Sequence, residues 1–250
     1  WEPDPAVLMP WAHLLGSDRA EPSPVRLRAQ RPKTVASLDT IPAVLEGMRR
    51  AAVKRLVFPS TSAVYGETAG KPLREDYGPL LPISLYGASK LACEGLVSAF
   101  SHNYGQQSWI FRFANIIGRN ATHGALFDFI CKLSKDSGRL SVLGDGTQSK
   151  PYLLVEDCVE GILFAIERAR APLNVFNLAC AGGTSVRAIA TTVVKEMGLK
   201  RVALEFSPGR RGWIGDVPFV RLDSRKIERL RDFACTAGVA GAVNVVVEVV

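Results

Sequence analysis

The feature that most constrains the fold is an apolar segment that ends in a run of hydroxyl side chains. Leu56-Val57-Phe58 has the composition of a buried strand, and Ser60-Thr61-Ser62 follows it almost at once. A loop rich in Gly and Pro, residues 66–82, then leads into a segment with helical spacing. In open α/β sheets, ligands bind beyond the carboxyl ends of the strands. This order therefore places Thr61 at such an edge.

Tyr86 and Lys90 stand four residues apart, which puts both side chains on one face of a helix. A free tyrosine has a pKa of about 10, so it is a poor base at neutral pH. A nearby ammonium group favours the phenolate, and we therefore expect Lys90 to lower the pKa of Tyr86. A tyrosine tuned in this way can accept a proton from an alcohol, and the Thr61 hydroxyl can steady the same oxygen.

A simpler alternative exists for each of these side chains. Tyr86 and Lys90 could form an exposed pair on an ordinary helix. Ser60, Thr61 and Ser62 could be hydroxyls that cap their own backbone at a strand end. The order of strand, loop and helix favours the chemical interpretation, and it favours Thr61 over its two neighbours.

Segments with helical and strand patterns alternate along the chain, which predicts an α/β doubly wound fold with a parallel sheet. The expected helices span about 41–52, 84–104, 125–135, 156–168 and 184–197. The expected strands span about 55–58, 108–113, 140–143 and 174–178. We expect Thr184 to cap the last of these helices. After Gly198 the segments become shorter and more mixed, which suits a smaller C-terminal lobe.

The composition is that of an ordinary soluble globular protein, with 47% apolar and 22% charged residues. No apolar run is long enough to span a bilayer, and no secretory signal is visible at the start. The five cysteines are scattered without a C-x-x-C pair, and we interpret them as reduced thiols. These observations predict a cytoplasmic protein without a membrane partner.

The formal net charge of +7 allows nucleic acid as a partner. No nucleic-acid-binding motif is recognisable, however, and the basic residues are spread through amphipathic segments, so we expect no nucleic acid. Anionic small ligands account for part of the positive charge. The three histidines have no metal-like spacing, so we predict no metal site.

The run FPSTSAVYG, which begins at Phe58, and the later YGASKLACE resemble the extended short-chain dehydrogenase/reductase family. Within it they are similar to the NAD-dependent nucleotide-sugar epimerases related to UDP-glucose 4-epimerase. The resemblance covers about residues 40–231, and it implies an NAD(P)-binding Rossmann-like domain with a smaller C-terminal substrate lobe. Three later stretches agree in order, namely RFANIIG (112–118), LGDGTQSKPYLLVEDCVEGILFAI (143–166) and GRRGWIGDVPFVRLDSRKI (209–227).

The resemblance also implies a role for individual residues. The implied catalytic set is Thr61, Tyr86 and Lys90, with Tyr86 as the acid/base and Lys90 as its partner. The residues implied at the NAD cofactor are Ser60, Tyr86, Lys90, Phe113 and Ala114. The residues implied at the nucleotide-sugar substrate are Thr61, Asn115, Lys150, Arg210, Arg211 and Asp216.

Several of the substrate residues have an alternative interpretation. Asn115 could be a turn residue before Gly118. Arg210 and Arg211 resemble the family's diphosphate clamp, and a solvated basic loop is an equal alternative. Lys150 stands where relatives often carry Arg, so it supplies a point charge without bidentate geometry.

The implied reaction is an epimerisation in which a ring hydroxyl of a nucleotide-linked sugar is oxidised and then reduced on its opposite face. The related 4,6-dehydratases follow the threonine with Asp-Glu. Ser62-Ala63 stand there instead, which argues for an epimerase or a simple reductase. The resemblance further implies a homodimer.

The start of the chain departs from the family pattern, because no glycine-rich phosphate loop is found in the first forty residues. One βαβ unit needs about 30 residues, and roughly 50 residues of the family pattern are missing upstream. We expect an irregular segment at 1–33, a partial Rossmann-like domain at 34–178 with substrate-side segments at about 119–150, a mainly substrate lobe at 179–232 and an atypical tail at 233–250. A truncated, non-catalytic sugar-nucleotide binding module therefore stays open beside the epimerase.

Overall fold

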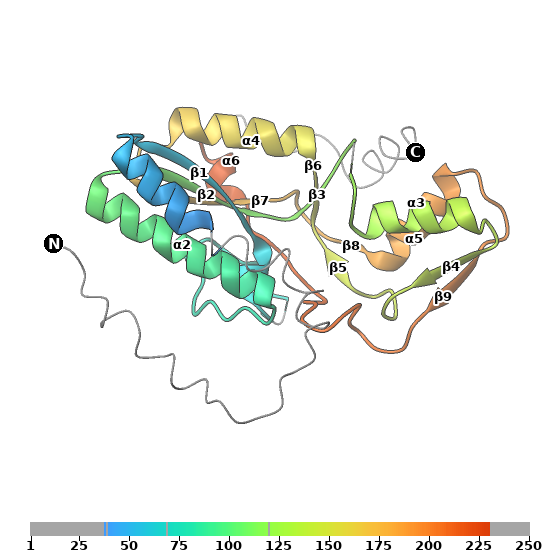
Figure 1. Cartoon of the computed structure of the whole chain (residues 1–250). Coiled ribbons are helices and arrows are strands. Elements are labelled where there is room, and N and C mark those ends of the chain that lie inside the picture. Colours follow the sequence, from blue (N-terminus) through green and yellow to red (C-terminus); the bar gives the residue numbers. More distant parts are fainter. Residues whose placement is uncertain (1–37, 39, 69, 120, 231–250) are drawn as a thin grey trace, which may run out of the picture.

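The computed structural model describes residues 38, 40–68, 70–119 and 121–230. The predicted segments at 1–33 and 233–250 lie outside these residues. The described chain forms two lobes side by side, one built on a parallel sheet and one built on two helices and a strand pair (Figure 1).

The first lobe contains a three-stranded parallel sheet in the order β1-β2-β7. Its strands are β1 (Arg55–Thr61), β2 (Gln107–Phe113) and β7 (Leu173–Leu178). The register pairs Thr61 with Phe113 and Phe113 with Leu178, so the three carboxyl ends lie at one edge of the sheet. This edge is where a parallel α/β sheet binds its ligands.

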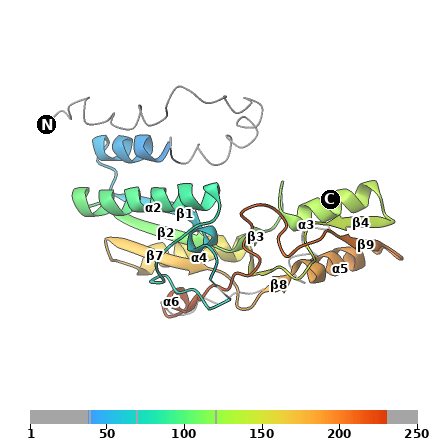
Figure 2. The same cartoon turned by 90° about the horizontal axis from the view of Figure 1, so that it is seen from below.

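Helices cover both faces of this sheet, as the alternating pattern predicts (Figure 2). On one face, α2 (Leu85–Tyr104) and the helix at residues 40–50 pack against Phe58 and Ile110. On the other face, α4 (Val155–Arg168) and α6 (Arg225–Glu228) pack against Trp109 and Phe111. Successive side chains of β2 point to opposite faces, so this continuous apolar run fills both cores.

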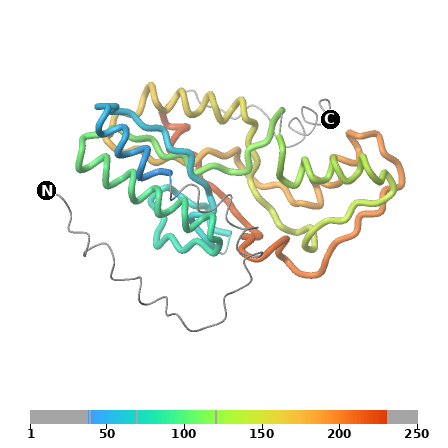
Figure 3. Tube along the Cα trace, viewed as in Figure 1, coloured from blue at the N-terminus to red at the C-terminus, as the bar shows by residue number. Residues whose placement is uncertain are grey.

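The second lobe has its own core between α3 (Ala125–Lys135), α5 (Val186–Glu196), β4 (Arg139–Val142) and β9 (Ala203–Phe206). Two short pairs lie between the lobes: β3 (Asn115–Ile117) with β6 (Tyr152–Leu154), and β5 (Ser149–Lys150) with β8 (Thr184–Ser185). The chain passes between the lobes more than once and ends its described part in α6, back on the sheet (Figure 3).

Local signals explain where α2 begins and ends. Ser84 is its N-cap and accepts a hydrogen bond from the Gly87 amide at 3.0 Å. Gly105 ends the helix in the left-handed conformation, with a φ of 62°. The predicted cap of α5 was wrong, because Ser185 rather than Thr184 accepts the bond from the Ala188 amide.

Cys93, Cys131 and Cys158 are free thiols, whereas Cys180 is disulfide-bonded, so the prediction of reduced thiols is wrong for Cys180. Among the helices that the structure describes, none is long and apolar enough to cross a membrane.

Candidate active site

A cleft of about 740 Å³ opens beyond the carboxyl ends of β1 and β2 and extends to the second lobe. It brings together most of the residues that the sequence singles out. Those that line it are Ser60, Thr61, Tyr86, Phe113, Ala114, Asn115, Lys150 and Asp216. Residues from both lobes therefore face one cavity, as a site for a cofactor and a substrate requires.

Thr61 is the last residue of β1 and the N-cap of the 3-10 helix η3 (Ser62–Tyr65). Its hydroxyl oxygen accepts a hydrogen bond from the Ala63 amide at 3.2 Å, so the capping alternative holds for Thr61. The same side chain also lies beside Tyr86 and lowers the pKa of its phenol. Thr61 therefore both ends the strand and contacts the tyrosine.

Close packing of α2 on η3 brings Tyr86 to this position. A Cβ atom at Gly87 would lie 2.6 Å from the Ala63 carbonyl oxygen, a distance that no side chain tolerates. A glycine next to Tyr86 thus lets the first turn of α2 approach the strand end. Tyr86 stays 41% exposed, so a ligand in the cleft can reach it.

The electrostatic environment of Tyr86 differs from the sequence prediction. Burial raises the pKa of Tyr86 above its ordinary value, and the neighbouring Thr61 hydroxyl opposes this rise in part. Lys90 takes no part in this balance. Its ammonium group donates to the Pro59 carbonyl at 2.9 Å and lies 4.9 Å from the centre of the Phe58 ring. The prediction that Lys90 lowers the pKa of Tyr86 is therefore wrong for this structure.

Lys90 is held one turn behind Tyr86, outside the set of side chains that line the cleft. Burial lowers the pKa of Lys90, and the Cys93 thiol raises it by a smaller amount. Ser60 is buried, and its hydroxyl donates to a carboxylate oxygen of Glu94 on α2. The Ser60 hydroxyl is thus engaged by the protein itself.

On the opposite wall, Lys150 of β5 forms an ion pair with Asp216 and lies 4.8 Å from the centre of the Trp213 ring. The Asp216 carboxylate also accepts a hydrogen bond from the Gly212 amide at 2.9 Å. Burial raises the pKa of the neighbouring Tyr152 to about 12, and the charge of Asp216 adds to this effect. The charge of Lys150 on this wall is therefore already paired with a carboxylate.

Asn115 begins β3 at the boundary between the lobes, and its side-chain amide donates to the Pro151 carbonyl at 3.5 Å. Gln148, which the sequence reasoning missed, lines the same wall, and its Oε1 atom is buried without a partner. Trp213 was also missed. The available signal was a large apolar pair, Trp213-Ile214, enclosed by glycines directly after Arg210 and Arg211.

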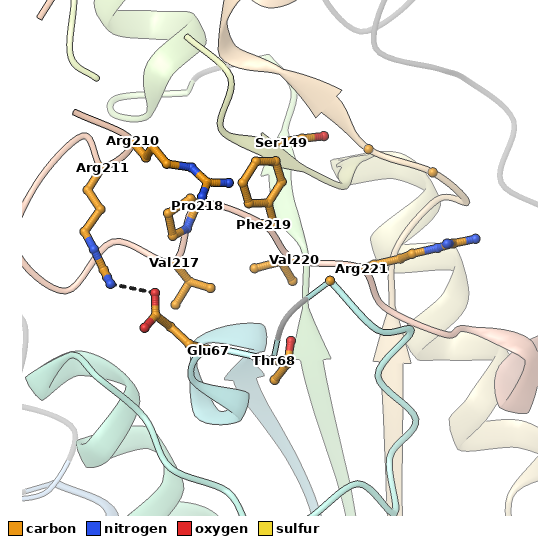
Figure 4. A pocket seen from close by; sticks show the side chains of 13 residues that line it. Glu67, Thr68, Ser149, Arg210, Arg211, Val217, Pro218, Phe219, Val220 and Arg221 are labelled. Carbon is orange, nitrogen blue, oxygen red and sulfur yellow. Dashed lines mark hydrogen bonds and ion pairs between the residues drawn. The ribbon is translucent and has the colours of Figure 1, made fainter. Parts of the chain in front are cut away.

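Arg210 and Arg211 line a second, neighbouring cavity of about 880 Å³ rather than the cleft (Figure 4). Arg211 donates to the Glu67 carboxylate at 2.6 Å and to the Asp216 carbonyl at 2.8 Å, so it links the two lobes. The Arg210 guanidinium lies 5.1 Å from the centre of the Phe219 ring. The role of both arginines at a diphosphate stays a prediction.

Comparison with known proteins places this geometry in a family. The family described as the NAD dependent epimerase/dehydratase family matches residues 23–179. The chain is 31% identical over 221 residues to a UDP-glucose 4-epimerase of Azospirillum brasilense, which covers 80% of this chain and 61% of that protein. It is 28% identical over 176 residues to an uncharacterised UDP-glucose epimerase of Bacillus subtilis, which covers 70% of this chain and 55% of that protein.

A crystal structure of a UDP-galactose 4-epimerase superposes on the chain with a TM-score of 0.76 and 32% identity. The match covers 92% of this chain and 74% of that one. It confirms the predicted doubly wound, Rossmann-like α/β fold. The chain spans little more than half the length of the two curated relatives.

Proposed function

Because this chain belongs to the NAD dependent epimerase/dehydratase family, we propose that it is a nucleotide-sugar 4-epimerase that works with NAD. The observation that carries the proposal is that Tyr86 and Thr61 lie together in one cleft at the carboxyl edge of the sheet. Both residues line a cleft whose far wall carries Asn115 and Lys150. The proposed acid/base and its neighbouring hydroxyl thus face polar groups suited to the diphosphate of a nucleotide-sugar.

The near end of the cleft fits the nicotinamide end of NAD. Phe113 and Ala114 give it an apolar wall beside the Thr61 and Tyr86 hydroxyls. Tyr86 would hold the nicotinamide ribose, next to the backbone of Ser60. Lys90 would join it only after its ammonium group releases the Pro59 carbonyl. When bound, NAD⁺ supplies the hydride acceptor for oxidation of the sugar.

The protein's own residues move the proton. Tyr86 takes the proton from the sugar hydroxyl as the carbon is oxidised and returns it when the carbon is reduced from its opposite face. Thr61 donates a hydrogen bond that holds the reacting oxygen in place. Ser62-Ala63 supply no carboxylate for loss of water, which favours epimerisation over dehydration.

At the far wall, Lys150 and Asn115 bind the diphosphate of the substrate. Because Lys150 is paired with Asp216, it attracts the diphosphate less strongly than an unpaired cation would. UDP-sugars are the substrates to test, since the relatives are described as UDP-sugar epimerases. The homodimer implied by the resemblance is also a proposal, which sedimentation of the purified chain tests.

A non-catalytic sugar-nucleotide binding module is the second candidate. It is favoured by the raised pKa of Tyr86 and by the bond of Lys90 to the Pro59 carbonyl, because neither prepares a phenolate. The two candidates differ in whether the chain binds NAD⁺ and whether it converts the bound sugar.

The test is to titrate the purified chain with NAD⁺ and with UDP-galactose, and then to assay formation of UDP-glucose. An epimerase binds both ligands and converts the sugar. Binding of UDP-galactose without binding of NAD⁺ at millimolar concentration, and without conversion, would support the binding module and overturn the epimerase.

A further inference from the structure

Three successive turns of α2 face three successive residues at the end of β1. Tyr86 lies beside the Thr61 hydroxyl, Lys90 donates to the Pro59 carbonyl at 2.9 Å, and Glu94 accepts from the Ser60 hydroxyl. The three helix residues are spaced four apart, so they form one stripe along the helix. These contacts fix the position of α2 along the axis of β1.

Glu94 is a buried member of the stripe, and a residue of the neighbouring strand β2 holds its carboxylate. Arg112 of β2 donates to the Glu94 carboxylate with Nη2 at 2.7 Å and with Nε at 3.1 and 3.2 Å. The side chains of Glu94 and Arg112 are only 7% and 6% exposed, respectively. Burial is the largest single effect and lowers the pKa of Arg112, but the bonds and charges of Glu94 and Tyr65 together outweigh it and hold that pKa above its ordinary value.

Arg112 has further partners that tie it to the loop after β1. Its Nη1 donates to the Tyr65 hydroxyl at 3.0 Å and to the Glu75 carbonyl at 3.1 Å. Tyr65 in turn donates to Asn177 of β7 at 2.8 Å. The ion pair is thus fixed from β2, from β7 and from the segment that follows Thr61, which leaves Glu94 one position to occupy.

We propose that the Glu94–Arg112 ion pair is a positioning device that sets the distance between the Tyr86 and Thr61 hydroxyls through the Ser60 bond. It rests on the proposed function, because the distance matters only if both hydroxyls act on one sugar oxygen. Neither charged residue lines the cleft, so both act through α2 and β1 rather than by contact with the substrate.

The alternative is that the pair only stabilises the fold. Removing one partner leaves a buried charge, so Glu94→Gln alone can reduce activity by unfolding. The paired variant Glu94→Met/Arg112→Met removes both charges and keeps a buried apolar contact, which buried ion pairs often tolerate. It also removes the acceptor of the Ser60 hydroxyl.

The paired variant is compared with Asn174→Ala. Asn174 is buried at the start of β7, at the far end of the same sheet, and bonds the Ser108 and Ala171 carbonyls. Tm, kcat and KM for UDP-galactose are measured for both variants. We expect the paired variant to lose about 100-fold in kcat at unchanged KM, since small misplacements of reacting groups cost that much. Asn174→Ala should lower Tm and leave kcat unchanged.

A crystal structure of the paired variant separates this proposal from the proposed function, because it needs no activity. An increased separation between the Tyr86 and Thr61 hydroxyl oxygens supports the positioning role, even for a chain without epimerase activity. An unchanged separation overturns it, as does a kcat that falls equally in the paired variant and in Asn174→Ala.

Discussion

The Tyr86 phenol lies beside the Thr61 hydroxyl, where the first turn of α2 meets the last residue of β1. The fold thus places together the two groups that the proposed chemistry uses. A helix that begins at a Ser84 cap and a strand that ends in a hydroxyl residue place both groups at the ligand-binding edge of a parallel sheet.

Thr61→Val removes the hydroxyl beside Tyr86 and keeps the shape of the side chain. We expect kcat to fall by about 100-fold, as for the loss of one donor to a reacting oxygen. Thr191→Val is the control, because the Thr191 hydroxyl bonds only the Arg187 carbonyl of its own helix among the contacts that the structure shows. Equal rates for Thr61→Val and wild type would contradict the assigned role.

The rate should depend on pH through Tyr86. Since burial raises the pKa of Tyr86, the phenolate fraction is small at neutral pH and grows with pH. We expect kcat/KM to increase from pH 7 up to and beyond a value of about 10, the ordinary pKa of tyrosine. A profile with its plateau near neutral pH would instead show that a cation lowers this pKa in the working complex.

Tyr152 links stability to alkaline pH. Its folded-state pKa of about 12 lies above the unfolded value, so the stabilisation is fully present below pH 10 and is lost as pH rises through 12. For a shift of two units this amounts to about 3 kcal/mol. Denaturant unfolding of Tyr152→Phe between pH 9 and 12 should show a smaller loss than wild type; Tyr104→Phe, an exposed position, should not.

Lys150 should affect stability and substrate binding separately. Lys150→Met leaves the buried Asp216 carboxylate without its cation, and we expect the free energy of unfolding to fall by about 3 kcal/mol. Adding Asp216→Asn removes that unpaired charge and should restore most of the stability. KM for the UDP-sugar should stay raised in both variants. A KM that recovers together with stability would mean that Lys150 only supports the fold.

Arg211 and Glu67 separate the two interpretations of the basic loop. Their ion pair is nearly half exposed on both sides and should contribute less than about 1 kcal/mol. If Arg211 binds the diphosphate, Arg211→Ala raises KM while Glu67→Ala leaves it unchanged or lowers it. Equal, small effects of the two variants would favour the solvated loop.

The main elements of the sheet lobe were predictable because their signals are local. The apolar run before Ser60 marks β1, and Ser84 and Gly105 bound α2 within one residue of the prediction. The short strands β3, β5, β6 and β8 have two or three residues each, too few to show a period. Strand β9 alternates between exposed and half-buried positions, so it lacks an apolar run.

The residues of the candidate site were predictable where sequence motifs mark them. The hydrogen bonds of side chains to backbone groups were not predictable. The bond of Lys90 to the Pro59 carbonyl depends on how α2 lies against β1, which no spacing reveals. Glu94 and Arg112 were missed, although one signal existed. A charged residue between Phe111 and Phe113 of a buried strand requires a buried partner of opposite charge.

The most direct test of the account compares Tyr86→Phe with Tyr104→Phe in the conversion of UDP-galactose to UDP-glucose with NAD⁺. Both changes remove one phenol hydroxyl from the same helix, at its first and last turns. We expect Tyr86→Phe to lower kcat by about 100-fold or more, the usual contribution of an acid/base group, while Tyr104→Phe keeps wild-type kcat. Equal kcat values for wild type and Tyr86→Phe would contradict the assignment of Tyr86 as the acid/base.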